Sequence, residues 1–208
     1  MVAENVLVGV TEIGVVVTGR YHFRVTPDAP EIWRIAPYPL VIKLPVPIPT
    51  ELKGYEAIYA TIRPMLTIKG TKYYPNEEIG YYEAPSLPRE AKLAVFSYWI
   101  EREDFSTDIE LDIQYDQPVV NVSGKDLVYY VPFLPGFERY QTRMNLNRNA
   151  YLVTFESHGT ASVRLTQPVS HLEQQRANFI AVRPKHREVI AVERETTPTL
   201  ELVPTPKD

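Results

Sequence analysis

The sequence predicts an all-β fold, a two-layer antiparallel sandwich or jelly roll with extended proline-rich arms and at most one or two short helices. Short segments rich in β-branched and aromatic residues recur along the whole chain. Glycine and 19 prolines separate them. There is no internal repeat and no alternation of helical with strand-like segments. Many short strands joined by Gly/Pro turns are typical of sandwiches and barrels.

Length and composition predict one large domain, residues 1–195, which includes a proline-rich arm at 26–49. Residues 196–208 are expected to form an extended C-terminal tail, because three prolines lie in the last stretch of chain. The chain has no cysteine, which excludes disulfides and cysteine-ligated metals. The first residues lack the pattern of a signal peptide, and no apolar stretch is long enough to span a membrane. We therefore expect synthesis in the cytoplasm and no membrane span.

The clearest pattern lies between residues 92 and 116. Apolar and polar residues alternate over 109–115, which predicts a strand with Leu111 and Ile113 on a core face and Glu110 in water. Residues 93–100 are apolar in both phases, which predicts a strand buried on both sides, Trp99 included. Because a short polar segment joins the two, we predict that they pair as an antiparallel hairpin.

The N-terminal half adds further strands and two irregular regions. Valine-rich residues 5–25 predict two or three strands. Residues 26–49 hold seven of the 19 prolines together with many aliphatic residues. Proline cannot donate to a ladder, so we expect an ordered edge strand or clasp, extended over 37–49. Residues 56–68 have the composition of strands, and the tyrosine-rich residues 70–88 are expected to form a long irregular loop.

The C-terminal half predicts two more hairpins, one modest helix and two final strands. Nine to twelve strands are expected in the whole chain. The hairpins are residues 118–122 with 127–131, and 151–155 with 161–165; the helix is residues 171–178; the final strands are 179–182 and 188–192.

Few residues offer catalytic chemistry. Glu110 and Asp112 lie on one face of a predicted strand, and paired carboxylates are what glycosidases require. A solvated acidic face explains this spacing equally simply and is the favoured interpretation. The four histidines have no metal-ligand spacing, and nucleophile and phosphate-loop motifs are absent. We expect no catalytic residue, no metal and no cofactor.

Charge is distributed unevenly and predicts surfaces that contact partners. Residues 1–136 have 12 Lys/Arg and 18 Asp/Glu, a net charge of −6; residues 137–194 have 9 and 5, a net charge of +4. Such a separation of charge steers association. The sequence pI of about 5.7 argues against direct contact with nucleic acid. The predicted partner contacts are Arg139, Arg143, Arg148, Arg183, Lys185 and Arg187, with Leu200 and Leu202 of the tail.

These patterns favour a non-enzymatic structural protein that assembles with copies of itself and with other assembly proteins. Virion components such as capsid, cement or decoration, and tail proteins are often sandwiches or jelly rolls with extended arms, and the virion is then the expected location. The alternative is a carbohydrate- or protein-binding β-sandwich module that uses Trp33, Trp99 and the tyrosines at 73–82. A glycan-active enzyme with paired carboxylates is the third hypothesis.

Overall fold

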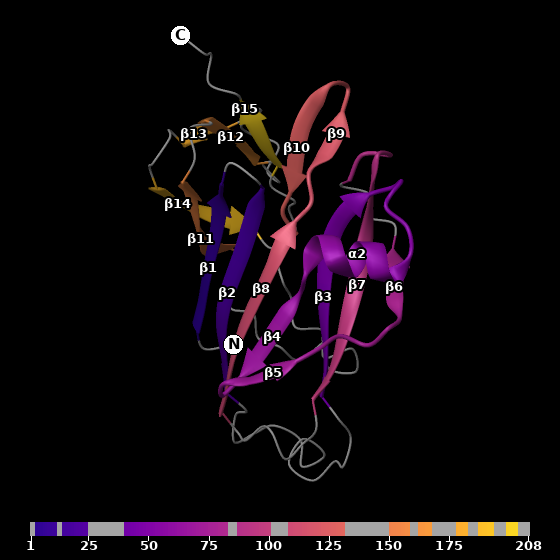
Figure 1. Ribbon diagram of the computed structural model, residues 1–208. Coiled ribbons are helices and arrows are strands. Elements are labelled where there is room, and N and C mark those ends of the chain that lie inside the picture. The colour runs from indigo at the N-terminus through magenta and orange to yellow at the C-terminus, as the bar shows by residue number, and fades with distance from the viewer. Residues whose placement is uncertain are drawn as a thin grey trace.

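The computed structural model describes residues 3–11, 14–24, 40–82, 87–100, 108–131, 150–158, 162–167, 178–182, 187–193 and 199–203. These residues form fifteen strands and one helix (Figure 1). The elements are β1 Ala3–Val10, β2 Val15–Arg24, β3 Leu40–Pro49, α2 Tyr55–Ile62, β4 Met65–Ile68, β5 Thr71–Tyr73, β6 Ile79–Tyr82, β7 Ala91–Ile100, β8 Asp108–Gln117, β9 Val120–Val122, β10 Lys125–Tyr129, β11 Ala150–Ser157, β12 Ser162–Gln167, β13 Asn178–Val182, β14 Arg187–Glu193 and β15 Thr199–Val203.

The strands form three sheets, which confirms the predicted all-β fold class. The seven-stranded sheet has the order β14-β11-β1-β2-β8-β4-β5. The five-stranded sheet has the order β13-β12-β15-β10-β9, and the three-stranded sheet the order β3-β7-β6. All pairs are antiparallel except β1 with β11, which is parallel.

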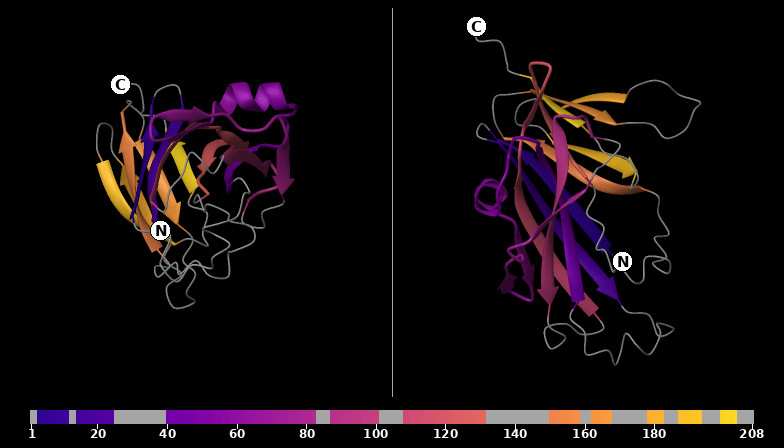
Figure 2. Two further views of the ribbon diagram at one scale, coloured as in Figure 1. Left: turned by 90° about the horizontal axis from the view of Figure 1, so that it is seen from below. Right: turned by 90° about the vertical axis from the view of Figure 1, so that its right-hand side faces the viewer.

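The core lies between one face of the seven-stranded sheet and one face of the three-stranded sheet. Leu111 and Ile113 of β8 belong to the same buried cluster as Leu44 of β3 and Phe96 of β7. Alternate residues of each strand supply these side chains, as the period of a strand requires. Helix α2 adds Ile58 and Ile62 to the cluster and lies at the periphery of the sheets (Figure 2).

The predicted hairpin of residues 93–100 with 109–115 is wrong. The first of these segments, in β7, pairs with β3 and β6, whereas the second, in β8, pairs with β2 and β4. The two strands instead contribute to one core from different sheets. Alternation shows which face of a strand is buried, but it does not distinguish a neighbour in the same sheet from a strand across the core. The burial of Leu111 and Ile113 is confirmed, and so is the exposure of Glu110.

The two C-terminal hairpin predictions have opposite outcomes. Strands β9 and β10 form the predicted hairpin, closed by Ser123 and Gly124 with φ of 52° and 79°. Two consecutive positive φ angles are those of the type I′ turn that two-residue hairpins favour. The hairpin of 151–155 with 161–165 is wrong, because β11 pairs with β1 and β14, and β12 pairs with β13 and β15. The strands predicted at 179–182 and 188–192 are confirmed as β13 and β14.

The predictions for the proline-rich residues 26–49 and the tyrosine-rich residues 70–88 also have different outcomes. Residues 40–49 form the extended edge strand β3, as predicted, and residues 26–39 lie outside the described residues. Within 56–68 a strand is present only as β4, since α2 occupies the first part. The predicted loop at 70–88 contains β5 and β6, so it is more regular than expected and the strand count exceeds twelve. Of the helix predicted at 171–178, only the last residue is described, and it begins β13.

Candidate interaction surfaces

Only part of the predicted contact set lies within the described residues. Arg187 begins β14, and Leu200 and Leu202 are in β15. Strand β15 lies between β12 and β10, so this part of the predicted tail is an internal strand of a sheet. The predicted contacts outside the described residues are Arg139, Arg143, Arg148, Arg183 and Lys185.

Arg187 belongs to a small cluster of charged groups on the outer face of the seven-stranded sheet. Its Nη2 lies 3.1 Å from Oε2 of Glu156, its cross-strand partner on β11. Nε2 of His158 lies 3.7 Å from the same oxygen. The His158 ring covers Gly9, where a Cβ would lie 3.6 Å from the ring. The cluster fixes the exposed end of β14 against β11.

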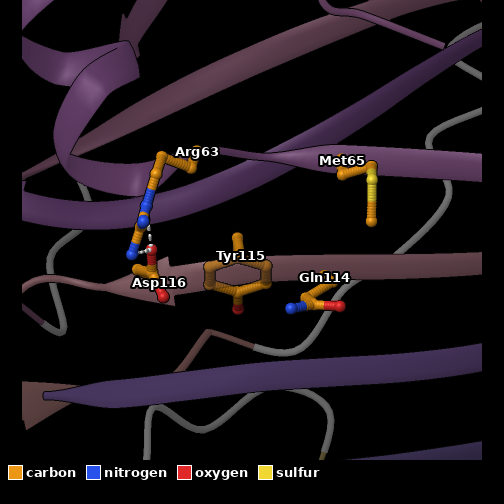
Figure 3. A pocket seen from close by; sticks show the side chains of 5 residues that line it. All are labelled: Arg63, Met65, Gln114, Tyr115 and Asp116. Atoms are coloured by element: carbon orange, nitrogen blue, oxygen red, sulfur yellow. Dashed lines mark hydrogen bonds and ion pairs between the residues drawn. The ribbon is translucent and has the colours of Figure 1, made fainter. Parts of the chain in front are cut away.

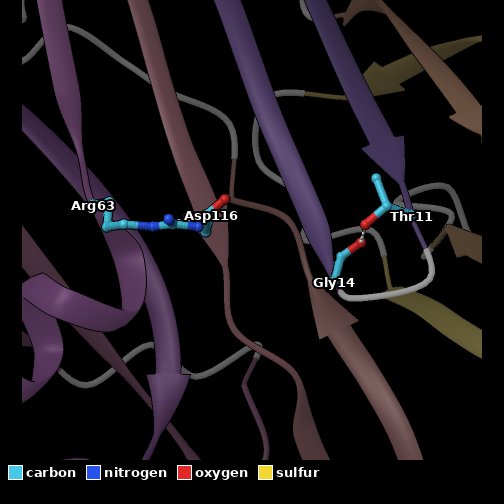
Figure 4. A network of polar contacts seen from close by, with 4 residues as sticks. All are labelled: Thr11, Gly14, Arg63 and Asp116. Atoms are coloured by element: carbon cyan, nitrogen blue, oxygen red, sulfur yellow. Dashed lines mark hydrogen bonds and ion pairs between the residues drawn. The ribbon is translucent and has the colours of Figure 1, made fainter.

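The outer face of β8 is polar and paired with cations. Asp112 accepts a hydrogen bond of 2.7 Å from Nε of Arg20, its cross-strand partner on β2. This hydrogen bond, with the charge of Asp112, raises the pKa of Arg20. Asp116 on the same face accepts from Nε of Arg63 at 2.6 Å (Figure 4). The acidic face of β8 is therefore largely matched by arginines of its own chain.

A shallow pocket of about 240 Å³ opens on this face at the end of α2. Arg63 ends the helix in the left-handed conformation and reaches Asp116 across the pocket (Figure 3). Met65 and Gln114 line its other side. Because Arg63 and Asp116 already bind each other, the pocket offers a ligand few unsatisfied charges. In the described part of the chain, no three His, Asp or Glu side chains gather to hold a metal ion.

The outer face of the three-stranded sheet is apolar. Trp99 is 56% exposed there, so its predicted place in the core is wrong. Val41 of β3 lies directly opposite it. We call this surface the Trp99 face, and it comprises Val41, Lys43, Pro45, Leu93, Val95, Ser97 and Trp99. Trp99 is its exposed residue, Val95 is buried at 7% exposure, and the other five are half-buried. The sequence pattern is compatible with it, because residues 93–100 are apolar in both phases and Trp99 lies in the phase directed away from the core cluster.

The free edge of β3 is closed to further strands. Proline has no N–H to give β7, so Pro45, Pro47 and Pro49 must occupy the positions that face away from it. The carbonyl oxygen of Pro47 accepts a hydrogen bond of 2.7 Å from Nε2 of Gln117, a buried side chain at the end of β8. Prolines at alternate positions predict such an edge; the contact with Gln117 has no signal in the sequence.

No helix in the described ranges is long and apolar enough to cross a membrane. No protein-family model matches the chain, and a comparison with curated proteins gives no match.

Proposed function

We propose that the protein is a non-enzymatic structural subunit that assembles with copies of itself. The observation that carries this proposal is the Trp99 face. Five of its seven residues are apolar; Trp99, near one end of β7, is 56% exposed, whereas Val95 is only 7% exposed. An apolar patch on the surface of a soluble protein can mark a contact site. Tryptophan is also the residue type that contributes most often and most strongly to protein interfaces.

The position of the Trp99 face supports a contact with a protein. It lies on the face of a sheet, from which side chains project, so a partner would cover side chains and not backbone groups. Val41 and Trp99 are directly opposite, so their side chains are neighbours on this face. Lys43 and Ser97 add polar groups within it, which favours a specific orientation of the partner.

The finer proposal is a virion component, as a capsid, decoration or tail protein, made in the cytoplasm and located in the virion. Its support is analogy at the level of architecture: layered β-sheets with a proline-rich edge and an apolar outer surface suit repeated side-by-side assembly. Other assembly proteins are then the additional partners.

The experiment is to measure association by sedimentation velocity over a range of protein concentrations. Trp99→Ser is expected to weaken association by about tenfold or more, since hot-spot tryptophans contribute about 2 kcal/mol or more. Tyr74→Ser is the matched control, because Tyr74 is an aromatic residue 68% exposed elsewhere. Equal association of the wild type and Trp99→Ser would contradict a role for this face, and a strictly monomeric wild type would contradict self-assembly.

A carbohydrate-binding module is the second candidate, and the same side chain favours it. An exposed, flat tryptophan ring on a β-sheet can stack on a sugar ring. Tyr81 is also exposed, but it lies opposite the buried Ala94, on the face of the sheet away from Trp99. Glycan-array binding that is lost in Trp99→Ser, with a monomeric wild type, would favour this function over assembly.

A further inference from the structure

We propose that the free edge of β14 is a second self-association site, where β14 of another copy adds as an antiparallel strand across a twofold axis. The proposal rests on the self-assembly proposed above and names a contact distinct from the Trp99 face. Strand β14 is one end of the seven-stranded sheet, and β11 is its partner within the described residues. It is the left-hand edge strand in Figure 1.

The backbone groups that face outward from β14 follow from the pairing of its neighbours. The N–H of His158 donates to the carbonyl of Val10 at 2.7 Å, so even-numbered positions of β11 face β1. Successive residues of a strand direct their backbone groups to opposite sides, so odd-numbered positions of β11 face β14. In the observed register, Val153 is opposite Ile190. Even-numbered residues of β14 therefore bond to β11, and the four odd-numbered residues face outward.

None of these four outward-facing residues is proline. They are Arg187, Val189, Ala191 and Glu193. Each offers one N–H and one carbonyl to a neighbour, so β14 presents a complete edge for strand addition. Strand β3 gives the contrast: three of its five outward-facing positions are prolines, and Gln117 binds one of their carbonyls.

The remaining free edges are shorter. Strands β5 and β9 have three residues each, β6 has four and β13 has five. Alternation leaves at most three outward-facing residues on any of them, against four on β14. The longest unblocked edge in the described part of the chain is thus that of β14.

The sequence of β14 fits a second copy of itself. In the antiparallel register centred on Ile190, Arg187 of each strand is opposite Glu193 of the other, and Val189 is opposite Ala191. This register pairs all four outward-facing residues and places opposite charges at both ends of the ladder. Opposite charges in cross-strand pairs are stabilising, whereas like charges are destabilising. Twofold pairing of identical surfaces is also the commonest form of homo-oligomer.

The first experiment is a charge exchange, measured by sedimentation equilibrium. Arg187→Glu and Glu193→Arg are each expected to weaken self-association by about tenfold, because each places like charges at both ends of the ladder. The double variant is expected to restore it. The double variant recreates the opposite charges between subunits but leaves Glu156 without its arginine. Recovery of self-association in the double variant would therefore show that the single variants do not act only by breaking the Arg187–Glu156 pair. A double variant as weak as Arg187→Glu would overturn the proposal.

Two further variants test the backbone contact. Val189→Pro removes one outward N–H, and Val189→Thr keeps it at nearly the same size; only the proline variant is expected to weaken association. In the chain without cysteine, Ile190→Cys is expected to form an intermolecular disulfide, because its Cα atoms would lie about 4.5 Å apart. Glu188→Cys is the control, since its two copies would be about 13 Å apart.

These results separate the two proposals. The β14 contact is wrong if the wild type associates, Val189→Pro and the charge variants associate as strongly as the wild type, and Ile190→Cys forms no intermolecular disulfide. Assembly through the Trp99 face would then stand. A wild type that is monomeric at every concentration overturns both proposals.

Discussion

The two described outer faces of the sandwich differ in chemistry although both belong to sheets that cover one core. On the seven-stranded sheet, Arg20 binds Asp112 and Arg63 binds Asp116, and the Arg20 and Asp112 side chains are 73% and 46% exposed. On the three-stranded sheet, the exposed Trp99 lies directly opposite Val41. The first face is compatible with water as it stands, whereas the second gains free energy when it is covered.

The difference separates residues that stabilise the fold from residues that are available to contact a partner. Residues directed to the core are apolar in both sheets, as folding requires. Residues directed outward need only be soluble, so the exposed Trp99 on the three-stranded sheet supports the contact proposed above. Substitutions on opposite faces of the same strand are the direct test of this comparison.

The largest effect is expected on β7. Phe96 is fully buried, and Phe96→Ala should destabilise the fold by about 3–5 kcal/mol through lost burial and the cavity left behind. Trp99→Ala, on the other face, should lower the free energy of unfolding by less than about 1 kcal/mol at concentrations where the protein is monomeric. Denaturant unfolding measures both. Equal losses would show that Trp99 is a core residue and not a contact residue.

A similar contrast is expected on β8. Leu111 is buried, and Leu111→Ala should cost about 2–5 kcal/mol. Glu110 is exposed on the polar face, and Glu110→Ala should change stability by less than about 0.5 kcal/mol. Urea unfolding of the two variants measures both changes in stability. A near-zero effect of Leu111→Ala would contradict its place in the core.

Sequence alone predicts the faces of these strands well and their neighbours poorly. Alternation identifies Leu111 and Ile113 as core, because inward and outward positions must differ in polarity. It does not identify β2 and β4 as the partners of β8, because pairing depends on contacts between segments far apart in the chain. The hairpin of β9 and β10 is predicted because a local turn with Gly124 fixes it, although the turn has two residues and not the four that separate the predicted strands.

For the candidate surfaces too, the sequence identifies individual residues but not the residues that they contact. Arg187 is identified from its charge, but its bond to Glu156 requires the pairing of β14 with β11. The helix α2 is missed, because β-branched and aromatic residues in residues 56–68 resemble a strand and packing of Ile58 and Ile62 on the core decides otherwise. Trp99 is misplaced, because apolar character in both phases does not say which side is covered.

Alkaline pH should weaken the fold through the core tyrosine of β7. Tyr98 is fully buried, its hydroxyl has no hydrogen-bond partner among the described residues, and burial raises its pKa far above the ordinary 10.0. Above pH 10.0 the unfolded chain releases this proton and the folded chain does not. Stability should therefore fall by up to ~1.4 kcal/mol per pH unit above that value and be insensitive to this group below it.

Tyr98→Phe is the variant that isolates this contribution. It removes the titrating group and the unpartnered hydroxyl, so its stability should equal or exceed that of the wild type near neutral pH. Its decline above pH 10.0 should be shallower, although Tyr115, whose pKa burial also raises, keeps part of the slope. Parallel slopes for the wild type and Tyr98→Phe in urea titrations at several pH values would contradict the assignment.

The smallest effect is expected on the outer face of the seven-stranded sheet, where the aspartates are already paired with arginines of the same chain. Asp112→Asn removes one charge of the Arg20 pair but keeps a side chain that can accept a hydrogen bond. Exposed ion pairs contribute about 0–1 kcal/mol, and salt screens them, so the loss should be below about 1 kcal/mol at low salt and smaller still at 1 M salt. Self-association should be unchanged, because this face is matched within its own chain. If Asp112→Asn instead weakened association as strongly as Trp99→Ser, the polar face would be a contact surface too, and the distinction between the two outer faces would fail.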